Sequence, residues 1–217
     1  RHVDEEKHQE IVGVLQSVAG AAQVKELRFD TIGPAVSETL KRRAYLALGI
    51  SASAIVLYIA WAFRKVSEPV SSWKYGVAAV IALIHDVILP LAVFAVLGRW
   101  YDVSVDSFFI TAMLTVMGFS VHDTIVIFDR IRENQMREGR KMPFESVINV
   151  SIRQTIARSV NTSLTVLLVL GAIYAFGGST IRSFSLALII GVAAGTYSSI
   201  FLASPLLAVW AGRTGRG

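Results

Sequence analysis

Charged side chains interrupt the apolar stretches of this chain at only a few places. His85 and Asp86 lie together in one stretch, His122 and Asp123 in another, and Arg158 begins a third. A carboxylate at the centre of a bilayer costs about 2.5–3.5 kcal/mol, so such residues usually face a helix bundle or water and carry a proton, an ion or a substrate. The simpler interpretation is a neutral Asp that hydrogen-bonds a neighbouring helix.

Asp123 and Arg158 are the two residues that could form a proton switch. An Asp and an Arg on facing helices can alternate between an ion pair and a separated state in which the Asp holds a proton. Arg158 also has a flexible stem that could reach lipid phosphates, and it would then only anchor its helix at the membrane surface. Asp86 is a supporting candidate, together with the neighbouring histidines His85 and His122.

Other kinds of site chemistry find little support in the residue pattern. The chain contains no Cys and shows no zinc-ligand spacing, phosphate-binding loop or nucleophile elbow, so we expect no metal, cofactor or catalytic residue. Ser120, His122 and Asp123 cannot form a catalytic triad because neighbours on one helix point about 100° apart. The formal charge of +5 does not indicate nucleic-acid binding, since the basic residues gather beside apolar stretches.

The composition predicts that these residues sit on membrane-spanning helices. Hydrophobic residues make up 53% of the 217 residues and charged residues 17%, and the mean hydropathy is +0.56, which is too apolar for an ordinary soluble domain. A helix needs roughly 20 apolar residues to cross about 30 Å of hydrocarbon. We therefore predict an all-α polytopic membrane protein with a bundle over residues 41–212 and five spans, at about 44–63, 75–98, 107–128, 159–181 and 183–212.

Basic residues predict the orientation of these spans. The joint between the third and fourth spans, residues 129–158, is rich in Arg and Lys, which favours the cytoplasmic side. Residues 1–40 are then external, and the tail at residues 213–217 is cytoplasmic. The basic stretch 41–43 would lie just outside the first span, an exception that a long translocated N-terminal domain tolerates.

Residues 1–40 have the pattern of the end of an external domain. EIVGVLQSV places apolar residues on one helical face, and QVKELRFDT (23–31) alternates as a strand does. Because one helix and one strand cannot bury a core, we expect the tail of an external α+β domain whose first half and preceding span are not part of this chain. Gly33 and Pro34 mark the turn into the first span. The apolar residues of the expected helix are Ile11, Val12, Leu15 and Val18.

The cytoplasmic joint contains a polar motif followed by an amphipathic stretch. Asp129, Arg130, Arg132 and Glu133 are typical of a solvated helix end, where the two arginines would stabilise the helix dipole. Pro143 begins a second helix whose apolar residues share one face, as in a helix that lies along the membrane surface. Those residues are Phe144, Val147, Ile148 and Ile152.

The fifth span contains two packing signals. Gly191 and Gly195 form a GxxxG pattern, which lets two helices approach closely, so we expect this face to pack against another helix of the chain or of a partner. Pro205 predicts a kink near the end of the same span.

Three stretches carry a resemblance to a known family: GFSVHDTIVIFDRIREN, NVSIRQTIARSVNTSLT and FGGSTIRSFSLALIIGVAAGTYSSIF. They closely resemble the SecF component of the bacterial SecDF protein-export machinery, a member of the RND superfamily, and the resemblance extends from Gly33 to about Pro205. It implies six spans, with a large external domain between the first and second, and it implies that Asp123 and Arg158 are the proton-relay pair. His122 departs from the family pattern, since many relatives have Asn there.

The resemblance also implies a function and partners. A SecF-like chain would sit in the bacterial cytoplasmic membrane, pair with SecD, either as a separate chain or within a SecDF fusion, and work with the SecYEG channel, YajC and preprotein substrates. It would not be an enzyme but would use the proton-motive force to assist protein export. Two alternatives from other classes are an RND-type exporter of small molecules and an intramembrane hydrolase built on the His-Asp pairs.

Overall fold

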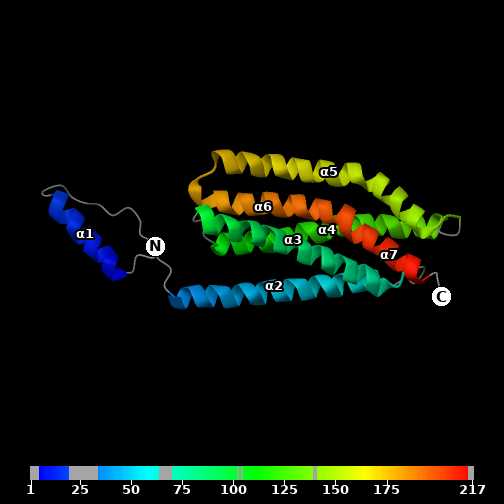
Figure 1. Cartoon of the computed structure of the whole chain (residues 1–217), viewed down its shortest axis with the longest axis horizontal. Helices are drawn as coiled ribbons and strands as arrows, with labels where there is room; N and C mark the ends of the chain where they lie inside the picture. The colour runs from blue at the N-terminus through cyan, green and yellow to red at the C-terminus, as the bar shows by residue number, and fades with distance from the viewer. Residues whose placement is uncertain are drawn as a thin grey trace. The chain divides into compact units, whose positions relative to one another are not determined.

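The computed structural model describes residues 5–19, 34–63, 70–101, 103, 105–138 and 141–214, and nearly all of them are helical (Figure 1). Five helices are long and apolar enough to cross a membrane, and no strand occurs among the described residues, so the predicted all-α polytopic fold is confirmed. The elements are α1 (Glu5–Ala19), α2 (Pro34–Ala62), α3 (Ser72–Tyr101), α4 (Ser107–Glu138), α5 (Phe144–Phe176), α6 (Ser179–Ser198), a π turn η1 (Ser199–Ala203) and α7 (Ser204–Thr214).

The chain divides into two compact units, Arg1–Leu46 and Ala47–Gly217. In the first unit the predicted helix is present as α1, and Ile11, Leu15 and Val18 on its apolar face are exposed. The predicted strand at 23–31 and the turn residue Gly33 lie outside the described residues. The external α+β domain therefore stays a prediction.

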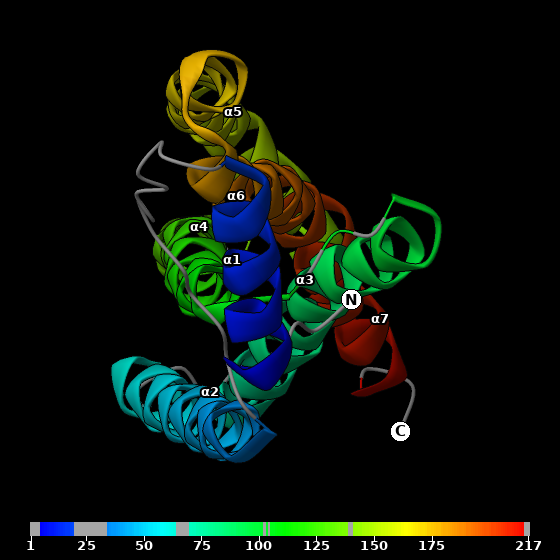
Figure 2. The ribbon, with the colours of Figure 1, turned by 90° about the vertical axis from the view of Figure 1, so that its left-hand side faces the viewer.

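In the second unit α6 is the central helix. It contacts α3, α4 and α5, and the view along the bundle shows these three helices arranged around it (Figure 2). Among the five apolar helices, α4 and the last one, which includes α6, are the most buried, and α2 and α5 the least. The bundle is therefore most shielded from its surroundings along α4 and α6.

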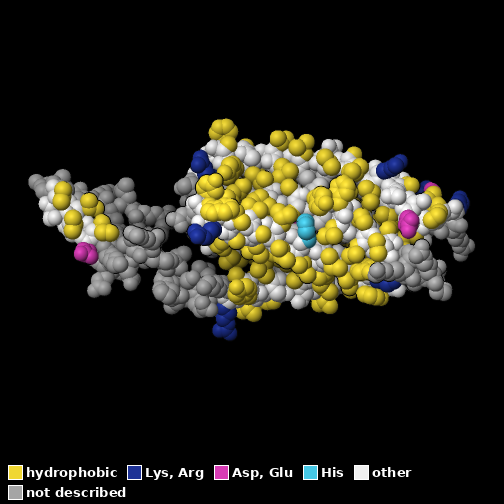
Figure 3. All heavy atoms as spheres, in the orientation of Figure 1, with side chains coloured by type: hydrophobic (Ala, Val, Ile, Leu, Met, Phe, Trp, Pro, Cys, Tyr) yellow, Lys and Arg dark blue, Asp and Glu magenta, His cyan; other side chains and the backbone are white. Residues whose placement is uncertain are grey.

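The outer surface of the bundle has the distribution of side chains that a bilayer requires. Hydrophobic side chains cover its middle, and Lys and Arg side chains lie towards its ends (Figure 3). Ile88, Leu168 and Phe201 are examples of large apolar side chains that are more than half exposed. Exposed apolar surface of this extent is typical of helices that face lipid or a membrane partner.

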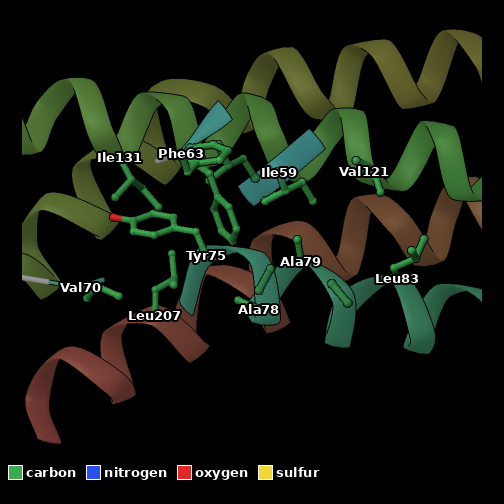
Figure 4. Packing of buried hydrophobic residues seen from close by; sticks show 14 of the residues in the cluster. Ile59, Phe63, Val70, Tyr75, Ala78, Ala79, Leu83, Val121, Ile131 and Leu207 are labelled. Atoms are coloured by element: carbon green, nitrogen blue, oxygen red, sulfur yellow. The ribbon is translucent and has the colours of Figure 1, made fainter. Parts of the chain in front are cut away.

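An aromatic cluster joins the end of α2 to α3 and α4 (Figure 4). The ring of Tyr75 stacks on Phe63, with centroids 5.4 Å apart, and meets the edge of Phe128 at 5.3 Å. Ile59 and Ile131 are fully buried beside these rings. Offset and edge-on ring pairs contribute about 0.5–1.5 kcal/mol beyond their burial, so this cluster fixes how the three helices approach one another.

Two expectations about the joint between α4 and α5 are wrong. Helix α4 does not end near Phe128 but continues to Glu138, so Arg130 and Arg132 lie inside the helix and cannot stabilise the dipole at its end. Helix α5 begins at Phe144 and runs without a break to Phe176, so there is no separate helix on the membrane surface. The apolar face that suggested such a helix packs on the bundle instead, where Val147 and Ile148 are buried.

The kink expected near Pro205 takes the form of the π turn η1. Proline has no backbone N–H, and its ring would clash with the carbonyl of Phe201 in a regular α-helix. A wider turn just before the proline avoids this conflict, and π turns often lie at functional sites. The hydroxyl of Ser204 donates to the carbonyl of Ser199 at 2.8 Å, which satisfies an acceptor in the widened turn.

Candidate functional site

Asp86 is fully buried on the inner face of α3, in helical register with Ala79, Ala82 and Pro90. Its Oδ2 accepts hydrogen bonds from two serine hydroxyls, Ser120 on α4 and Ser198 on α6, and the distance from Ser198 is 2.7 Å. Three helices therefore meet at one carboxylate. Hydrogen bonds between helices stabilise their contact inside a membrane, so Asp86 helps to hold α3, α4 and α6 together.

His85 lies beside Asp86 but not inside the bundle. Its Nδ1 is 2.9 Å from Asp86 Oδ1, while the side chain is about one third exposed, at 34%. The imidazole ring lies near the ring of Tyr197 on α6, with centroids 6.4 Å apart. His85 thus connects the buried carboxylate to the outer surface of the bundle.

Asp123 is the second buried carboxylate, 7% exposed on the inner face of α4. Its Oδ2 accepts a hydrogen bond of 2.6 Å from the hydroxyl of Ser199, the first residue of the π turn. The next residue, Thr124, is also buried, and its Oγ1 has no hydrogen-bond partner within the described part of the chain. Asp123 and Ser199, with Thr124 next to Asp123 on α4, therefore form a small polar cluster where α4 meets the π turn.

Ser198 and Ser199 connect the two carboxylates through the backbone. Neighbouring residues on a helix point about 100° apart, so consecutive serines face different neighbours. Ser198 reaches Asp86 on α3, and Ser199 reaches Asp123 on α4. One peptide unit at the end of α6 thus joins two acidic residues that are far apart along the sequence.

Two glycines on α6 allow α4 to come close enough for these contacts. A Cβ added at Gly191 would overlap the side chain of Val116, and a Cβ at Gly195 would lie 3.2 Å from both Cα and Cβ of Ser120. The same added atom would be 3.6 Å from Asp86 Oδ2. The small-residue face of α6 therefore packs against α4 of the same chain and borders the carboxylate site.

Hydroxyl groups also connect α5 to α6. Ser163 and Thr196 lie 2.5 Å apart, Oγ to Oγ1, and either one can donate. Ser159 is one turn earlier on α5, and its buried Oγ has no hydrogen-bond partner among the described residues. Because α5 and α6 are consecutive and antiparallel, a step from Ser163 back to Ser159 corresponds to a step from Thr196 towards the π turn.

His122 and Arg158 do not join Asp123 in this arrangement. Both side chains are exposed, His122 on α4 and Arg158 on α5. Within the part of the chain that the structure describes, neither forms a hydrogen bond or ion pair with Asp123, and Arg158 forms no ion pair at all. The relay pair of Asp123 and Arg158 therefore stays a prediction.

The motif at residues 129–133, inside α4, forms a polar network with α5. Arg130 donates to Glu133 at 2.5 Å and, through Nε, to Gln154 at 2.6 Å. The buried Asn134 donates to Ser151 at 2.9 Å and to Gln154 at 2.8 Å, so both hydrogens of its amide are used. These bonds fix the angle at which α5 leaves the joint.

The outer residues of this motif make weaker contacts. Asp129 is largely exposed and lies 3.7 Å from Arg132, and the second contact of Glu133, to Arg137, is equally long. Exposed ion pairs of this kind contribute about 0–1 kcal/mol. No group of three or more His, Cys, Asp or Glu residues that could hold a metal ion lies in the described segments.

Comparison with known proteins decides the family. Residues 13–213 match the family described as "Protein export membrane protein SecD/SecF, C-terminal". The chain belongs to this SecD/SecF family. A protein translocase subunit SecF from Thermobaculum terrenum is 53% identical over 186 residues, which cover 86% of this chain and 57% of the relative. A protein translocase subunit SecDF from Thermus thermophilus is 40% identical over 187 residues, 86% of this chain and 24% of the relative.

Solved SecDF structures have the same arrangement of helices. The crystal structure of SecDF from Thermus thermophilus, described as a translocon-associated membrane protein, superimposes with a TM-score of 0.81 at 36% identity, over 97% of this chain and 27% of that one. A second SecDF structure, in a super-membrane-facing form, gives 0.75 at 34% identity, over 98% and 27%. The chain spans about 57–60% of the length of the first two SecF relatives.

Within this SecD/SecF bundle, the sequence identified the two carboxylates but not their partners. Ser120, Ser198 and Ser199 carry no distinctive motif, because a serine in a membrane helix usually bonds the carbonyl of its own preceding turn. The one available signal was position: Ser198 and Ser199 follow Gly195 by three and four residues and so share its close-packed face.

Proposed function

We propose that this chain is the membrane bundle of a SecF-type translocase subunit that uses proton flow to assist protein export, with Asp123 as the proton carrier. The observation that supports this most is the setting of Asp123. It is nearly buried between membrane helices, and its hydrogen-bond partner is the neutral hydroxyl of Ser199 rather than a cation. A carboxylate without a fixed counter-charge can be stable with a proton and can release it when a cation approaches.

Arg158 is proposed as the cation that approaches. It is exposed on α5 and forms no ion pair among the described residues, which fits the separated half of a cycle in which Asp123 holds its proton. In the other half, movement of α5 relative to α4 would bring the guanidinium to the carboxylate. Ser159, whose buried hydroxyl has no partner in the described chain, lies next to Arg158 and would move with it.

The membrane potential is large enough to drive such a cycle. Moving one elementary charge through 100 mV contributes about 2.3 kcal/mol, which is similar to the cost of about 2.5–3.5 kcal/mol for a charge at the bilayer centre. A free energy of this size can shift a two-state bundle from mostly one form to mostly the other. The work would be delivered to an external domain that acts on preproteins.

The proposal extends to the membrane in which the chain lies, its orientation there and its partner proteins. The chain would lie in the bacterial cytoplasmic membrane, with residues 1–40 external, the joint at 129–158 and the C-terminus cytoplasmic, because Arg and Lys gather in that joint. Its partner would be a SecD-type chain or domain, as the names of its SecDF relatives suggest. SecYEG, YajC and preproteins complete the proposed assembly.

Replacement of Asp123 by Asn tests the proposal. Asp123→Asn keeps the size and polarity of the side chain but fixes it uncharged, so the complex should assemble while gradient-dependent export is lost. Arg158→Lys keeps the charge without the forked geometry and should retain part of the activity. A matched control is Glu138→Gln, which removes a carboxylate from the exposed end of the same helix.

The measurement is export of a secreted preprotein into vesicles that contain each full-length variant with its partners, at equal abundance, with and without a proton gradient. The control should respond to the gradient as the unaltered protein does. Full stimulation by the gradient in the Asp123→Asn variant would refute the role of this carboxylate.

A further inference from the structure

The hydroxyls of Ser198 and Ser199 each have one hydrogen and two acceptors within reach. Ser199 Oγ lies 2.6 Å from Asp123 Oδ2 and 3.0 Å from the carbonyl of Thr196. Ser198 Oγ lies 2.7 Å from Asp86 Oδ2 and 3.2 Å from the carbonyl of Gly195. A hydroxyl can donate to only one of two acceptors at full strength. Each serine hydrogen therefore bonds either the carboxylate or the backbone carbonyl of the preceding turn.

The protonation state of the carboxylate determines which of the two acceptors the serine hydrogen bonds. An ionised carboxylate accepts only, so it takes the hydroxyl hydrogen of the serine. A protonated carboxyl group can instead donate its own hydrogen to the serine oxygen, and the serine hydrogen then turns to the backbone carbonyl. Protonation adds a donor, so one hydrogen bond becomes two, and the donated hydrogens then point from carboxyl group to hydroxyl and from hydroxyl to carbonyl.

The carbonyls that would receive this hydrogen lie where α6 changes into the π turn. The carbonyl of Gly195 already accepts the backbone N–H of Ser199, and η1 begins at the next turn. Serine hydroxyls that bond back to the preceding turn weaken and bend helices. A reversal at either serine therefore acts on the backbone at its least regular point.

The helices that pack around Ser198 and Ser199 carry few charged groups within the membrane. Apart from Asp123 itself, α3 contributes Asp86 with the partly exposed His85, α4 contributes the exposed His122, and α5 contributes the exposed Arg158. The described part of α6 and the π turn contain only one charged residue, Arg182, near the opposite end of the helix. No charged side chain of α6 thus competes with the serines.

We propose that Ser199 is a positioning residue that reverses its hydrogen bond when Asp123 gains or loses a proton, and that Ser198 does the same at Asp86. The two carboxylates then act on one peptide unit, and the π turn is the element that responds. This inference rests on the proposed function of Asp123 and adds the route by which its proton alters the shape of the last span.

Infrared difference spectroscopy of the full-length protein with its SecD-type partner in lipid vesicles tests this route. A step to lower pH should produce the C=O stretching band of a protonated carboxyl group, and the part of the band that Asp123→Asn abolishes belongs to Asp123. In Ser199→Ala this part should shift to higher frequency, because the hydrogen bond from the carboxyl group to the serine oxygen is lost. Ser199→Thr, which restores a hydroxyl, should return the band to its original position.

Controls separate this role from simple packing. Ser185 is a buried serine on α6 whose hydroxyl bonds the carbonyl of Ile181, at 2.9 Å, and no carboxylate among the described residues, so Ser185→Ala should leave the band in place. Ser199→Cys offers a weaker acceptor of similar shape and should give an intermediate shift if the alanine variant does not assemble. The band that Asp86→Asn abolishes should respond to Ser198→Ala in the same way.

The outcomes distinguish the inference from the function on which it rests. An Asp123 band that keeps its frequency in both Ser199→Ala and Ser199→Cys overturns the inference and leaves Asp123 as a proton carrier. If no band disappears in Asp123→Asn, then the carboxylate does not take up a proton, and the proposed function fails together with the inference.

Discussion

Alanine at Gly191 tests how closely α4 and α6 approach. The added Cβ would overlap Val116, whose own Cβ would be 3.0 Å away and whose methyl groups would be closer still, and Val116 is fully buried. Overpacking of a core typically costs about 1–3 kcal/mol, and a β-branched side chain has few rotamers in which to avoid the clash. Alanine also favours a helix over glycine by about 1 kcal/mol, so the net loss should be about 0–2 kcal/mol.

A second substitution shows whether the clash is the cause. Val116→Ala removes the methyl groups that the new Cβ meets, so Gly191→Ala should be neutral or stabilising by up to about 1 kcal/mol in that background, a coupling of about 1–3 kcal/mol. Gly195→Ala should not be relieved by Ser120→Ala, because the atoms it meets are the Cα and Cβ of Ser120, which remain. The matched control is Gly118→Ala on α4, where nothing lies within 4 Å of the added Cβ.

The free energy of unfolding of each variant can be measured in detergent micelles by titration with a denaturing detergent, with helicity followed by circular dichroism. Gly118→Ala should gain up to about 1 kcal/mol from helix propensity alone. If Gly191→Ala gains as much as Gly118→Ala, or if its effect is the same with and without Val116→Ala, then the close contact between α4 and α6 is not as described.

Two further predictions concern the joint between α4 and α5. Asn134→Ala removes one buried and one partly buried hydrogen bond to α5 and should lower the free energy of unfolding by about 1–3 kcal/mol in the same assay. Asn161→Ala on the exposed face of α5 should change it by less than about 0.5 kcal/mol, and equal effects would contradict the network. The chain has no Cys, so a single introduced Cys can be labelled specifically in intact cells. With the proposed orientation, Arg137→Cys should resist a membrane-impermeant thiol reagent, while Val105→Cys between α3 and α4 should react. The opposite pattern would reverse the orientation.

The five apolar helices were predictable because length and hydropathy determine which segments can cross a membrane. The C-terminal end of α4 and the start of α5 were not predictable. The residues around Ile131 and Ile148 are too polar on average for a span, yet their apolar faces pack on the bundle. A pattern of this kind is the same for a helix on a membrane surface and for one on a protein core. Only the tertiary contacts distinguish the two.

The site was predictable in part for a similar reason. Each His-Asp pair showed that a carboxylate lies within a span, but helix geometry alone does not say which member of a pair faces inward. In both pairs the Asp is buried, while His85 is partly exposed and His122 is exposed. The serine partners could not be identified in advance, because they depend on how α4 and α6 pack. Ser199 also begins the π turn, and Pro205 signals an irregularity without specifying its form.

The position of the two serines has a consequence for biogenesis. Helices α3 and α4 leave the ribosome before α6, so Asp86 and Asp123 are made before Ser198 and Ser199 exist. A polar group without a partner in hydrocarbon costs several kcal/mol, which favours retention of the early spans near water or an insertase until the last one arrives. A chain that stops short of residue 198 leaves Asp123 without the hydroxyl of Ser199, and leaves Asp86 with Ser120 and His85 but without Ser198. These missing hydrogen bonds distinguish an unfinished chain from a finished one.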